Sequence, residues 1–424
     1  MSQAAAGSHH DHDHGPATGL ISVEEARERI LSAIQPLAPI ELPLQEASGC
    51  VVATGTVAEG HLPEFSSSAM DGYAARSHDV AGASEDEPVT LRVVGLARIG
   101  RRPDATVGGG EAVRIDTGAP VPAGADCVVP IEYTEAAGDR VRVRQPFAEG
   151  RNVRPAGEDV RAGDVLVPAG RRLTGAELGL LALSGHPQVA AHPRPRVIVL
   201  STGDELVEPW QQAEFGQVRD ANAFTIFGGL RDAGAVPYLA GIVRDDPEAL
   251  KETILSHLVQ ADAYISSGGV SVGERDVVKR AFFRRGEVDF FRVAMQPGMP
   301  QAFGMIEGKP YFGLPGNPVS VFVSFEVFVR PAIMKLMGRK DLLRPEISAR
   351  LATEISGPKD RLQFARVLVK RGRDGWVAES TGGSSSNLVS TVAKANGLAM
   401  IPAGVETAPA GSEVRVLVFR SMES

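Results

Sequence analysis

The spacing of apolar residues predicts a helix near the start of the chain. Ser22 and Glu25 stand three residues apart, which is the pattern of a capping box at a helix N-terminus. Apolar residues then recur at helical spacing up to Ile34, and Pro36 ends the pattern. We therefore expect a helix that begins after Ser22.

Short strands are predicted for the region that follows. Apolar and polar residues alternate in several short stretches, and glycine and proline separate these stretches. We expect a β-rich insert domain over residues 61–159. Residues 19–60 and 160–192 would form a separate linking domain, with a helix at 174–184. The clearest alternating stretches are residues 91–94, 112–115 and 141–144.

The pattern changes again after residue 192. Residues 197–200 are all apolar, which is typical of a parallel strand buried on both faces. Predicted strands and helices then alternate, so we expect a doubly wound α/β domain over residues 193–342. A long apolar helix from Asn317 to about Gly338 would end it. Alternation returns beyond that point, which predicts a small C-terminal β domain over residues 343–424. The strands expected in the α/β domain are residues 197–200, 238–243 and 263–266, and its other helices are residues 221–233, 247–259 and 276–283.

Composition narrows the class of protein. The chain has 424 residues, enough for several domains, and a formal net charge of −8. A nucleic-acid partner is not expected, because such proteins usually carry a basic surface stripe. No apolar run has the length of a membrane span, and no apolar segment of a secretory signal opens the chain. We expect a cytoplasmic protein with no membrane partner.

Cysteine and histidine add little chemistry. Cys50 and Cys127 stand in no metal-binding spacing, so we expect both to be core thiols in a reducing compartment. The histidine-rich stretch within residues 1–18 could bind a divalent metal weakly. Its position in a small, polar, terminal segment favours a disordered tail without a defined role.

Three loops of the predicted α/β domain carry polar chemistry. Residues 201–206, STGDEL, follow the first buried strand, where hydroxyls, a glycine and two carboxylates suit a phosphate with a divalent cation. A helix cap and turn is the alternative. Residues 266–276, SSGGVSVGERD, follow another strand and are rich in glycine and serine, which lets the backbone approach a ligand closely. Asp276 could hold a cation there, whereas a tight turn is the simpler alternative.

The third loop, residues 313–320, reads GLPGNPVS and leads into the long predicted helix. Asn317 can cap this helix and Pro318 suits its first position. The helix would then present free N–H groups to an anion, unless the loop is only a well-capped helix start. All three loops fall at the same edge of one predicted sheet, which favours a shared ligand.

These loops and three further segments resemble the molybdopterin molybdenumtransferases and the matching domain of gephyrin. The resemblance extends from about Gly19 almost to the C-terminus. It implies a multidomain α/β plus β fold: a MogA/MoaB-like doubly wound α/β domain, a β-rich insert domain, an elongated linking domain and a C-terminal small β-barrel domain. The segments are FSSSAMDGYA at 65–74, RIDTGAPVP at 114–122, GED at 157–159, STGDE at 201–205, SGGVSVG at 267–273 and LPGNPVS at 314–320.

The resemblance also implies an activity. The enzyme would insert molybdate into adenylyl-molybdopterin in an Mg²⁺-dependent reaction that releases AMP, and it would act as a homodimer whose cleft lies between the α/β domain and the partner's insert. Asp71 or Asp159 would position water or take a proton. The catalytic residues would be Asp71, Thr117, Asp159 and Asp245, and the Mg²⁺ ligands Glu205 and Asp276. The substrate-binding residues would be Ser201, Thr202, Gly203, Ser267, Gly268, Gly269, Ser271, Gly273, Pro315, Gly316, Asn317, Pro318, Ser320, Gln296, Arg366 and Ser386.

The sequence departs from the family pattern at the expected molybdate subsite. Many relatives have lysine where Gln296 stands, and often also where Met299 stands. A glutamine can donate a hydrogen bond but carries no charge, and methionine offers neither. Either Arg292 or Arg366 compensates for the missing charge, or the subsite tolerates neutral residues, which we favour because backbone N–H groups also bind anions.

Two other functions stay open at this point. A non-catalytic molybdopterin-binding scaffold of the same fold would have no need for all five acids, Asp71, Asp159, Glu205, Asp245 and Asp276. A nucleotide-processing α/β hydrolase would leave the β insert unexplained.

Overall fold

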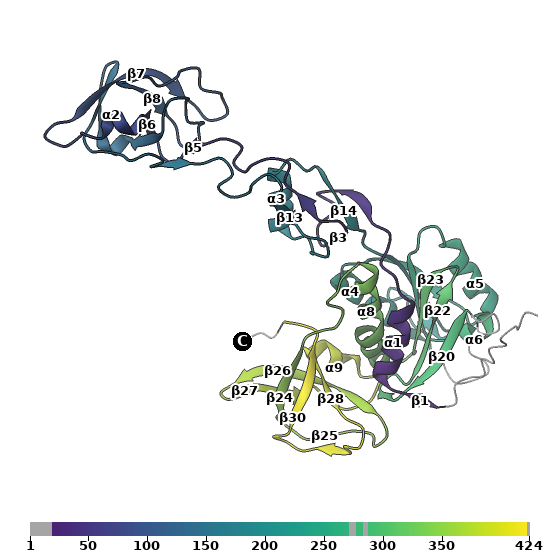
Figure 1. Ribbon diagram of the computed structural model, residues 1–424. Helices are drawn as coiled ribbons and strands as arrows, with labels where there is room; N and C mark the ends of the chain where they lie inside the picture. Colours follow the sequence, from purple (N-terminus) through teal and green to yellow (C-terminus); the bar gives the residue numbers. More distant parts are fainter. Residues whose placement is uncertain (1–18, 271–276, 283–286, 422–424) are drawn as a thin grey trace, which may run out of the picture. The chain divides into compact units, whose positions relative to one another are not determined.

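A computed structural model describes residues 19–270, 277–282 and 287–421 of the chain (Figure 1). The chain divides into two compact units. The first unit comprises Met1–Ile40, Gly49–Val51 and Ala191–Ser424, and the second comprises Glu41–Ser48 and Val52–Ala190.

A seven-stranded sheet forms the centre of the first unit, in the order β1-β20-β22-β23-β19-β15-β18. The predicted strands are present, and most neighbours run parallel as expected. One feature was not predicted: β22 runs antiparallel to both of its neighbours, so the sheet is mixed. The strands are β1 (Leu20–Ile21), β15 (Arg196–Thr202), β18 (Val236–Val243), β19 (Ala263–Ser267), β20 (Val288–Val293), β22 (Pro300–Ile306) and β23 (Lys309–Leu314).

Helices cover both faces of this sheet, which confirms the doubly wound arrangement. Alternate residues of β15 show this: Val197 and Val199 pack in one core with α1, α4, α7 and α8, whereas Ile198 and Leu200 pack in another with α5 and α6. Ser22 Oγ accepts a hydrogen bond from the Glu25 backbone N–H, as its capping pattern predicts. The helices are α1 (Val23–Ala33), α4 (Asn222–Ala233), α5 (Pro247–Ser256), α6 (Val277–Phe282), α7 (Pro318–Ser324) and α8 (Arg330–Leu336).

The long helix expected after Asn317 is interrupted. A π-helical segment, Phe325–Val329, separates α7 from α8. This segment contains Glu326, which is buried and paired with Arg344 (Nε to Oε2, 2.9 Å). A π-helical turn contains one residue more than an α-helical turn. Every residue of this segment is buried, so the spacing of apolar residues alone could not reveal the additional residue.

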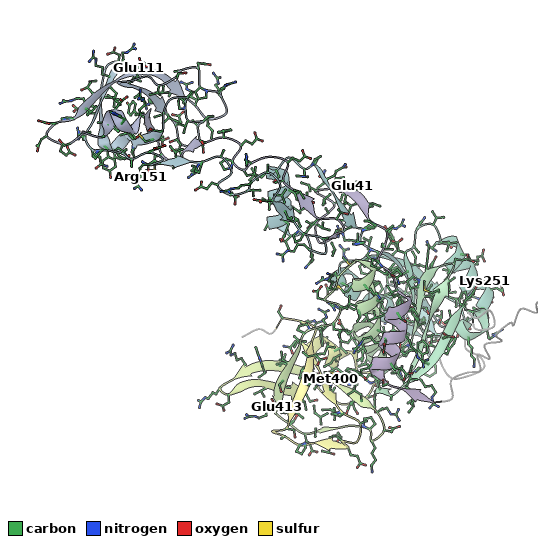
Figure 2. The ribbon with its side chains drawn as sticks, viewed as in Figure 1. Glu41, Glu111, Arg151, Lys251, Met400 and Glu413 are labelled. Carbon is green, nitrogen blue, oxygen red and sulfur yellow. The ribbon has the colours of Figure 1, made fainter. Side chains whose placement is uncertain are left out.

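The C-terminal strands close into a five-stranded barrel, which confirms the expected β-barrel domain (Figure 1). Closure comes from β26, which pairs with β27 on one side and with β28 on the other. Figure 2 shows Met400 of β28 and Glu413 of β30 on this barrel. The strands are β24 (Glu346–Leu351), β26 (Leu362–Gly372), β27 (Gly375–Ser380), β28 (Gly397–Ile401) and β30 (Glu413–Val418), β21 (Met295–Gln296) joins at β26, and α9 (Val389–Lys394) precedes β28.

A six-stranded sheet lies within the expected β-rich insert, in the order β10-β11-β7-β8-β6-β9. Figure 2 marks Glu111, the first residue of β8, and Arg151 in this part of the chain. Cys127 is buried here and Cys50 is buried elsewhere, and the two do not form a disulfide. The elements are β6 (Gly72–Ala75), α2 (Ser77–Val80), β7 (Val89–Ala97), β8 (Glu111–Ile115), β9 (Cys127–Pro130), a 3-10 turn (Ile131–Tyr133), β10 (Thr134–Ala137) and β11 (Arg140–Val143).

Short strands in pairs, a three-stranded sheet (β2-β14-β3) and one helix complete the described part of the chain. Helix α3 (Gly175–Leu183) begins at Thr174, which forms the full capping box with Glu177. Among all the described residues of the chain, no helix is long and apolar enough to cross a membrane. The remaining strands are β2 (Ile40–Pro43), β3 (Val51–Val52), β4 (Thr56–Val57), β5 (Ser67–Ser68), β12 (Val153–Arg154), β13 (Val165–Val167), β14 (Gln188–His192), β16 (Leu206–Val207), β17 (Val218–Arg219), β25 (Ile355–Ser356) and β29 (Thr407–Ala408).

Candidate functional site

The strand order of the seven-stranded sheet creates a crevice at one edge. After β15 the chain passes through α4 to β18, and after β18 it returns through α5 to β19 on the opposite side of β15. The loops that leave β15 and β19 therefore diverge at the carboxyl ends of adjacent parallel strands. Open α/β sheets bind ligands at such a switch point.

A cavity of about 740 Å³ lies at this position. All three loops predicted from the sequence contribute to its wall. The predicted residues that line it are Thr202, Gly203, Glu205, Asp245, Ser267, Gly268, Gly269, Pro315, Gly316 and Asn317. The other lining residues are Leu206, Asn222, Val270, Val277, Arg292, Met299 and Pro300.

Two glycines let the loop after β19 pack closely against the loop after β15. Gly268 and Gly269 have φ angles of 86° and 66°, in the left-handed region that other residues rarely adopt. A Cβ atom on Gly268 would lie 2.5 Å from the Thr202 carbonyl oxygen, and one on Gly269 would lie 2.7 Å from Val277 Cγ1. The loop can therefore follow this path only with glycine at Gly268, where the obstacle is backbone.

Negative charge collects beside the cavity. Burial raises the pKa of Asp245 above its ordinary value, and the nearby carboxylates of Asp204 and Glu205 raise it further. The Asp204 side chain also accepts a long hydrogen bond from the Asp245 backbone N–H, at 3.4 Å. Oxygen donors with excess negative charge suit a hard divalent cation such as Mg²⁺. Among the described residues, however, no three acidic, histidine or cysteine side chains form a ready-made metal cluster.

Some predicted binding residues lie away from the cavity wall. The Ser201 hydroxyl is buried and hydrogen-bonded to the Ser267 hydroxyl at 2.9 Å, so it links β15 to β19. Ser320 is buried in α7, and Pro318 lines a separate pocket beside α4 and α9. Their proposed contacts with substrate stay predictions.

The start of α7 is capped differently from the sequence prediction. Asn317 occupies the N-cap position, but its side chain makes no capping hydrogen bond. The Val319 backbone N–H instead donates to the Ser386 carbonyl oxygen at 3.0 Å. Ser386 thus contributes through its backbone to the start of this helix.

The residues of the expected molybdate subsite separate into different surroundings. Met299 and Arg292 line the large cavity, and the Arg292 guanidinium lies 3.7 Å from the Met299 sulfur. Gln296 lines a smaller cavity of about 290 Å³ together with Gln363. Arg366 is buried, which lowers its pKa, and its guanidinium donates to the Thr391 hydroxyl and to the carbonyls of Gly383 and Ser385. Of the two arginines that could compensate for the missing lysines, only Arg292 therefore lines the large cavity.

The predicted catalytic residues of the insert belong to the second unit. Asp71 and Thr117 are paired: the Asp71 carboxylate accepts hydrogen bonds from the Thr117 backbone N–H at 2.6 Å and from its hydroxyl at 2.8 Å. These bonds lower the pKa of Asp71, the backbone bond most strongly. Asp159 is exposed, and its backbone N–H donates to the Leu62 carbonyl.

Three predicted residues, Ser271, Gly273 and Asp276, lie outside the described residues. Asn222 is a polar lining residue that the sequence did not predict. It stands two residues after Asp220 at the start of α4, where an asparagine near a helix start indicates a cap rather than a ligand contact.

Comparison with known families accounts for most of the chain. Residues 21–185 match the MoeA N-terminal region (domain I and II). Residues 198–335 match a probable molybdopterin binding domain, and residues 348–419 match the MoeA C-terminal region (domain IV). Along the chain, the three matched regions contain in turn the six-stranded sheet of the insert, most of the seven-stranded sheet and the C-terminal barrel.

Individual proteins agree with the family matches. The chain is 41% identical over 401 residues to molybdopterin molybdenumtransferase 2 of Mycobacterium tuberculosis, covering 93% of this chain and 98% of that protein. It is 38% identical over 381 residues to molybdopterin molybdenumtransferase of a Nostoc species, covering 88% and 87%. The crystal structure of a molybdopterin biosynthesis MoeA protein from Pyrococcus horikoshii has a TM-score of 0.82 at 32% identity, covering 95% of this chain and 100% of that one.

Proposed function

Because the chain belongs to the molybdopterin molybdenumtransferase family, we propose that it inserts molybdate into adenylyl-molybdopterin with Mg²⁺-dependent release of AMP. It is accordingly a transferase of molybdenum cofactor biosynthesis. The observation that carries the proposal is the cavity at the switch point of the sheet. Glycine-rich backbone, hydroxyls and carboxylates meet there, as a phosphoanhydride substrate requires.

Substrate phosphates would lie against the loop at Gly268 and Gly269. Backbone N–H groups of this loop would orient phosphate oxygens without side-chain charge, other than the Gly268 N–H, which donates to the Leu314 carbonyl oxygen at 3.0 Å. Molybdate would bind beside Arg292, the cation that lines the cavity where relatives have lysines nearby. The part of the site that binds molybdate would also be shaped by Gln296, Arg366 and Ser386.

Glu205 and Asp276 would hold the Mg²⁺ ion, with Asp245 close to Glu205. The raised pKa of Asp245 fits this role, because a concentration of carboxylates favours a bound cation. When bound, Mg²⁺ neutralises phosphate charge during cleavage of the phosphoanhydride. Acidic side chains would position water and accept or donate protons near the phosphates.

The insert would act through a homodimer in the cytoplasm. Thr117 lowers the pKa of Asp71, so Asp71 stays a carboxylate further into acid than an ordinary aspartate, and at the partner subunit's cavity it would position water or take a proton. Asp159 is the second acid of the insert with this proposed role. Neither is assigned as the general base.

The test is reconstitution with purified full-length protein. Adenylyl-molybdopterin, Mg²⁺ and molybdate are added, and AMP release and active cofactor are measured. We expect both products, and we expect Asp276→Ala to abolish Mg²⁺-dependent turnover while far-UV circular dichroism stays unchanged. Tight substrate binding by the intact protein without AMP release would instead support a molybdopterin-binding scaffold, and unchanged turnover in Asp276→Ala would remove Asp276 from the reaction.

A further inference from the structure

Asn222 carries an unpartnered hydrogen-bond acceptor in the wall of the large cavity. The residue is 8% exposed, and its side-chain Nδ2 donates to the Gly316 carbonyl oxygen at 2.8 Å. A carbonyl oxygen can only accept, so this bond fixes which end of the amide faces Gly316. The other end, Oδ1, is buried and has no hydrogen-bond partner in the structure.

A buried acceptor without a partner has lost its hydrogen bonds to water, and a ligand that donates to it removes this penalty. The surroundings of Asn222 indicate the chemistry of that ligand. Asp220 is buried, and its carboxylate accepts hydrogen bonds from the Asn222 and Ala223 backbone N–H groups at 3.0 and 3.1 Å. It therefore occupies the start of α4, where an anion would otherwise bind. A phosphate is disfavoured here, whereas an uncharged N–H or O–H donor is favoured.

We propose that Asn222 is a specificity-determining residue whose Oδ1 accepts a hydrogen bond from an uncharged donor of the pterin nucleotide, on its heterocycle or its ribose. This inference rests on the proposed function for the identity of the substrate. The cavity would then have two parts. The glycine-rich loop after β19 would bind phosphate, and the start of α4 would bind an uncharged hydrogen-bond donor. The same amide also holds Gly316 of the third loop against α4.

The test compares wild-type protein with Asn222→Ala by titration calorimetry. Three probes are used: adenylyl-molybdopterin, molybdopterin and AMP. Each half of a cleaved phosphoanhydride keeps one phosphate, so both halves report on the phosphate loop, but only one half carries the donor that reaches Asn222. We expect Asn222→Ala to weaken binding of adenylyl-molybdopterin and of one half by about tenfold, which is the loss of one good hydrogen bond, and to leave the other half unchanged.

Two results would overturn the proposal. Unchanged affinity for all three probes would mean that no group of these ligands donates a hydrogen bond to Oδ1. Equal weakening of both halves means that Asn222 acts only by holding Gly316. The thermal unfolding temperature without ligand is measured in parallel, so that a folding defect is recognised. If Asn222→Ala shows the selective loss but wild-type protein releases no AMP, the proposed function fails while Asn222 keeps its role in binding.

Discussion

Asp71 shows how a single neighbour sets the charge of an acid. Its carboxylate is exposed, yet two hydrogen bonds from Thr117 lower its pKa below the ordinary value. A carboxyl with a lowered pKa in the folded state stabilises that state above the unfolded pKa. This contribution is lost as the pH falls through the folded pKa. The pair thus keeps Asp71 ionised further into acid.

Removing the Thr117 hydroxyl tests this account. We expect Thr117→Val to raise the pKa of Asp71 part of the way to its ordinary value, because the stronger backbone bond remains. The stabilising contribution of Asp71 should then disappear at a higher pH than in the wild type. NMR titration of the Asp71 carboxyl carbon measures the shift, with Thr90→Val on the exposed side of β7 as control. An unchanged Asp71 titration would show that the hydroxyl bond is without effect.

Sequence could predict residues of the site whose role is local. Gly268 and Gly269 stand out because a run of glycines after a strand permits close backbone approach. Asn222 could not be found in this way, because its amide is oriented by Gly316, 94 residues further along the chain. The contacts of Arg366 were equally hidden: Gly383 and Ser385 belong to a loop and Thr391 to α9, and no local pattern predicts that they meet this side chain.

Helix α4 contains two adjacent glycines with opposite surroundings. A Cβ atom on Gly228 would meet no heavy atom within 4 Å, whereas one on Gly229 would lie 2.5 Å from Phe325 Cε1 in the π-helical segment. The close packing of α4 against the π-helical segment therefore requires a residue without a Cβ atom at Gly229.

The two glycines form a matched pair for mutation. Gly228→Ala should stabilise the protein by about 0.5–1 kcal/mol, because alanine loses less backbone entropy in a helix. Gly229→Ala should destabilise it by about 1–3 kcal/mol, because the Phe325 ring must move in a packed core. Urea unfolding followed by tryptophan fluorescence measures both. Similar changes in the two variants would contradict the close contact.

Elements that depend on local signals were predicted well. The pattern of Ser22 and Glu25 marked the start of α1, since an N-cap is read within four residues. The antiparallel strand β22, the π-helical segment and the closure of the barrel by β26 and β28 were not foreseen, except that a barrel was implied by family resemblance. Each of these depends on pairing or packing between distant residues.

At the scale of the whole molecule, the two compact units have separate hydrophobic cores. Leu91 is buried in the core of the insert sheet, and Leu230 is buried in the core that α4 shares with the seven-stranded sheet. Both tryptophans of the chain, Trp210 and Trp376, belong to the first unit. Tryptophan fluorescence therefore follows the first unit, whereas far-UV circular dichroism follows both.

Core truncations should separate the two signals. Leu91→Ala should lose about 2–5 kcal/mol from the second unit, so part of the circular dichroism transition moves to lower urea while the fluorescence midpoint stays in place. Leu230→Ala, the matched control, should move the fluorescence midpoint. A fluorescence midpoint that shifts equally in both variants would mean that the chain unfolds as one cooperative body.

The barrel and the α/β sheet, in contrast, share one core. Phe364, Leu398 and Phe419 of the C-terminal region pack in the same cluster as Val319 and Phe325 of the helices over the sheet. Phe322 and Phe419 meet edge to face with ring centroids 4.9 Å apart. A shortened gene that ends before β24 would remove Phe419 and leave the Phe322 ring without this cover. Any ancestor or engineered version without the barrel would therefore need polar residues on that helix surface, so the loss of one part requires a change in the other.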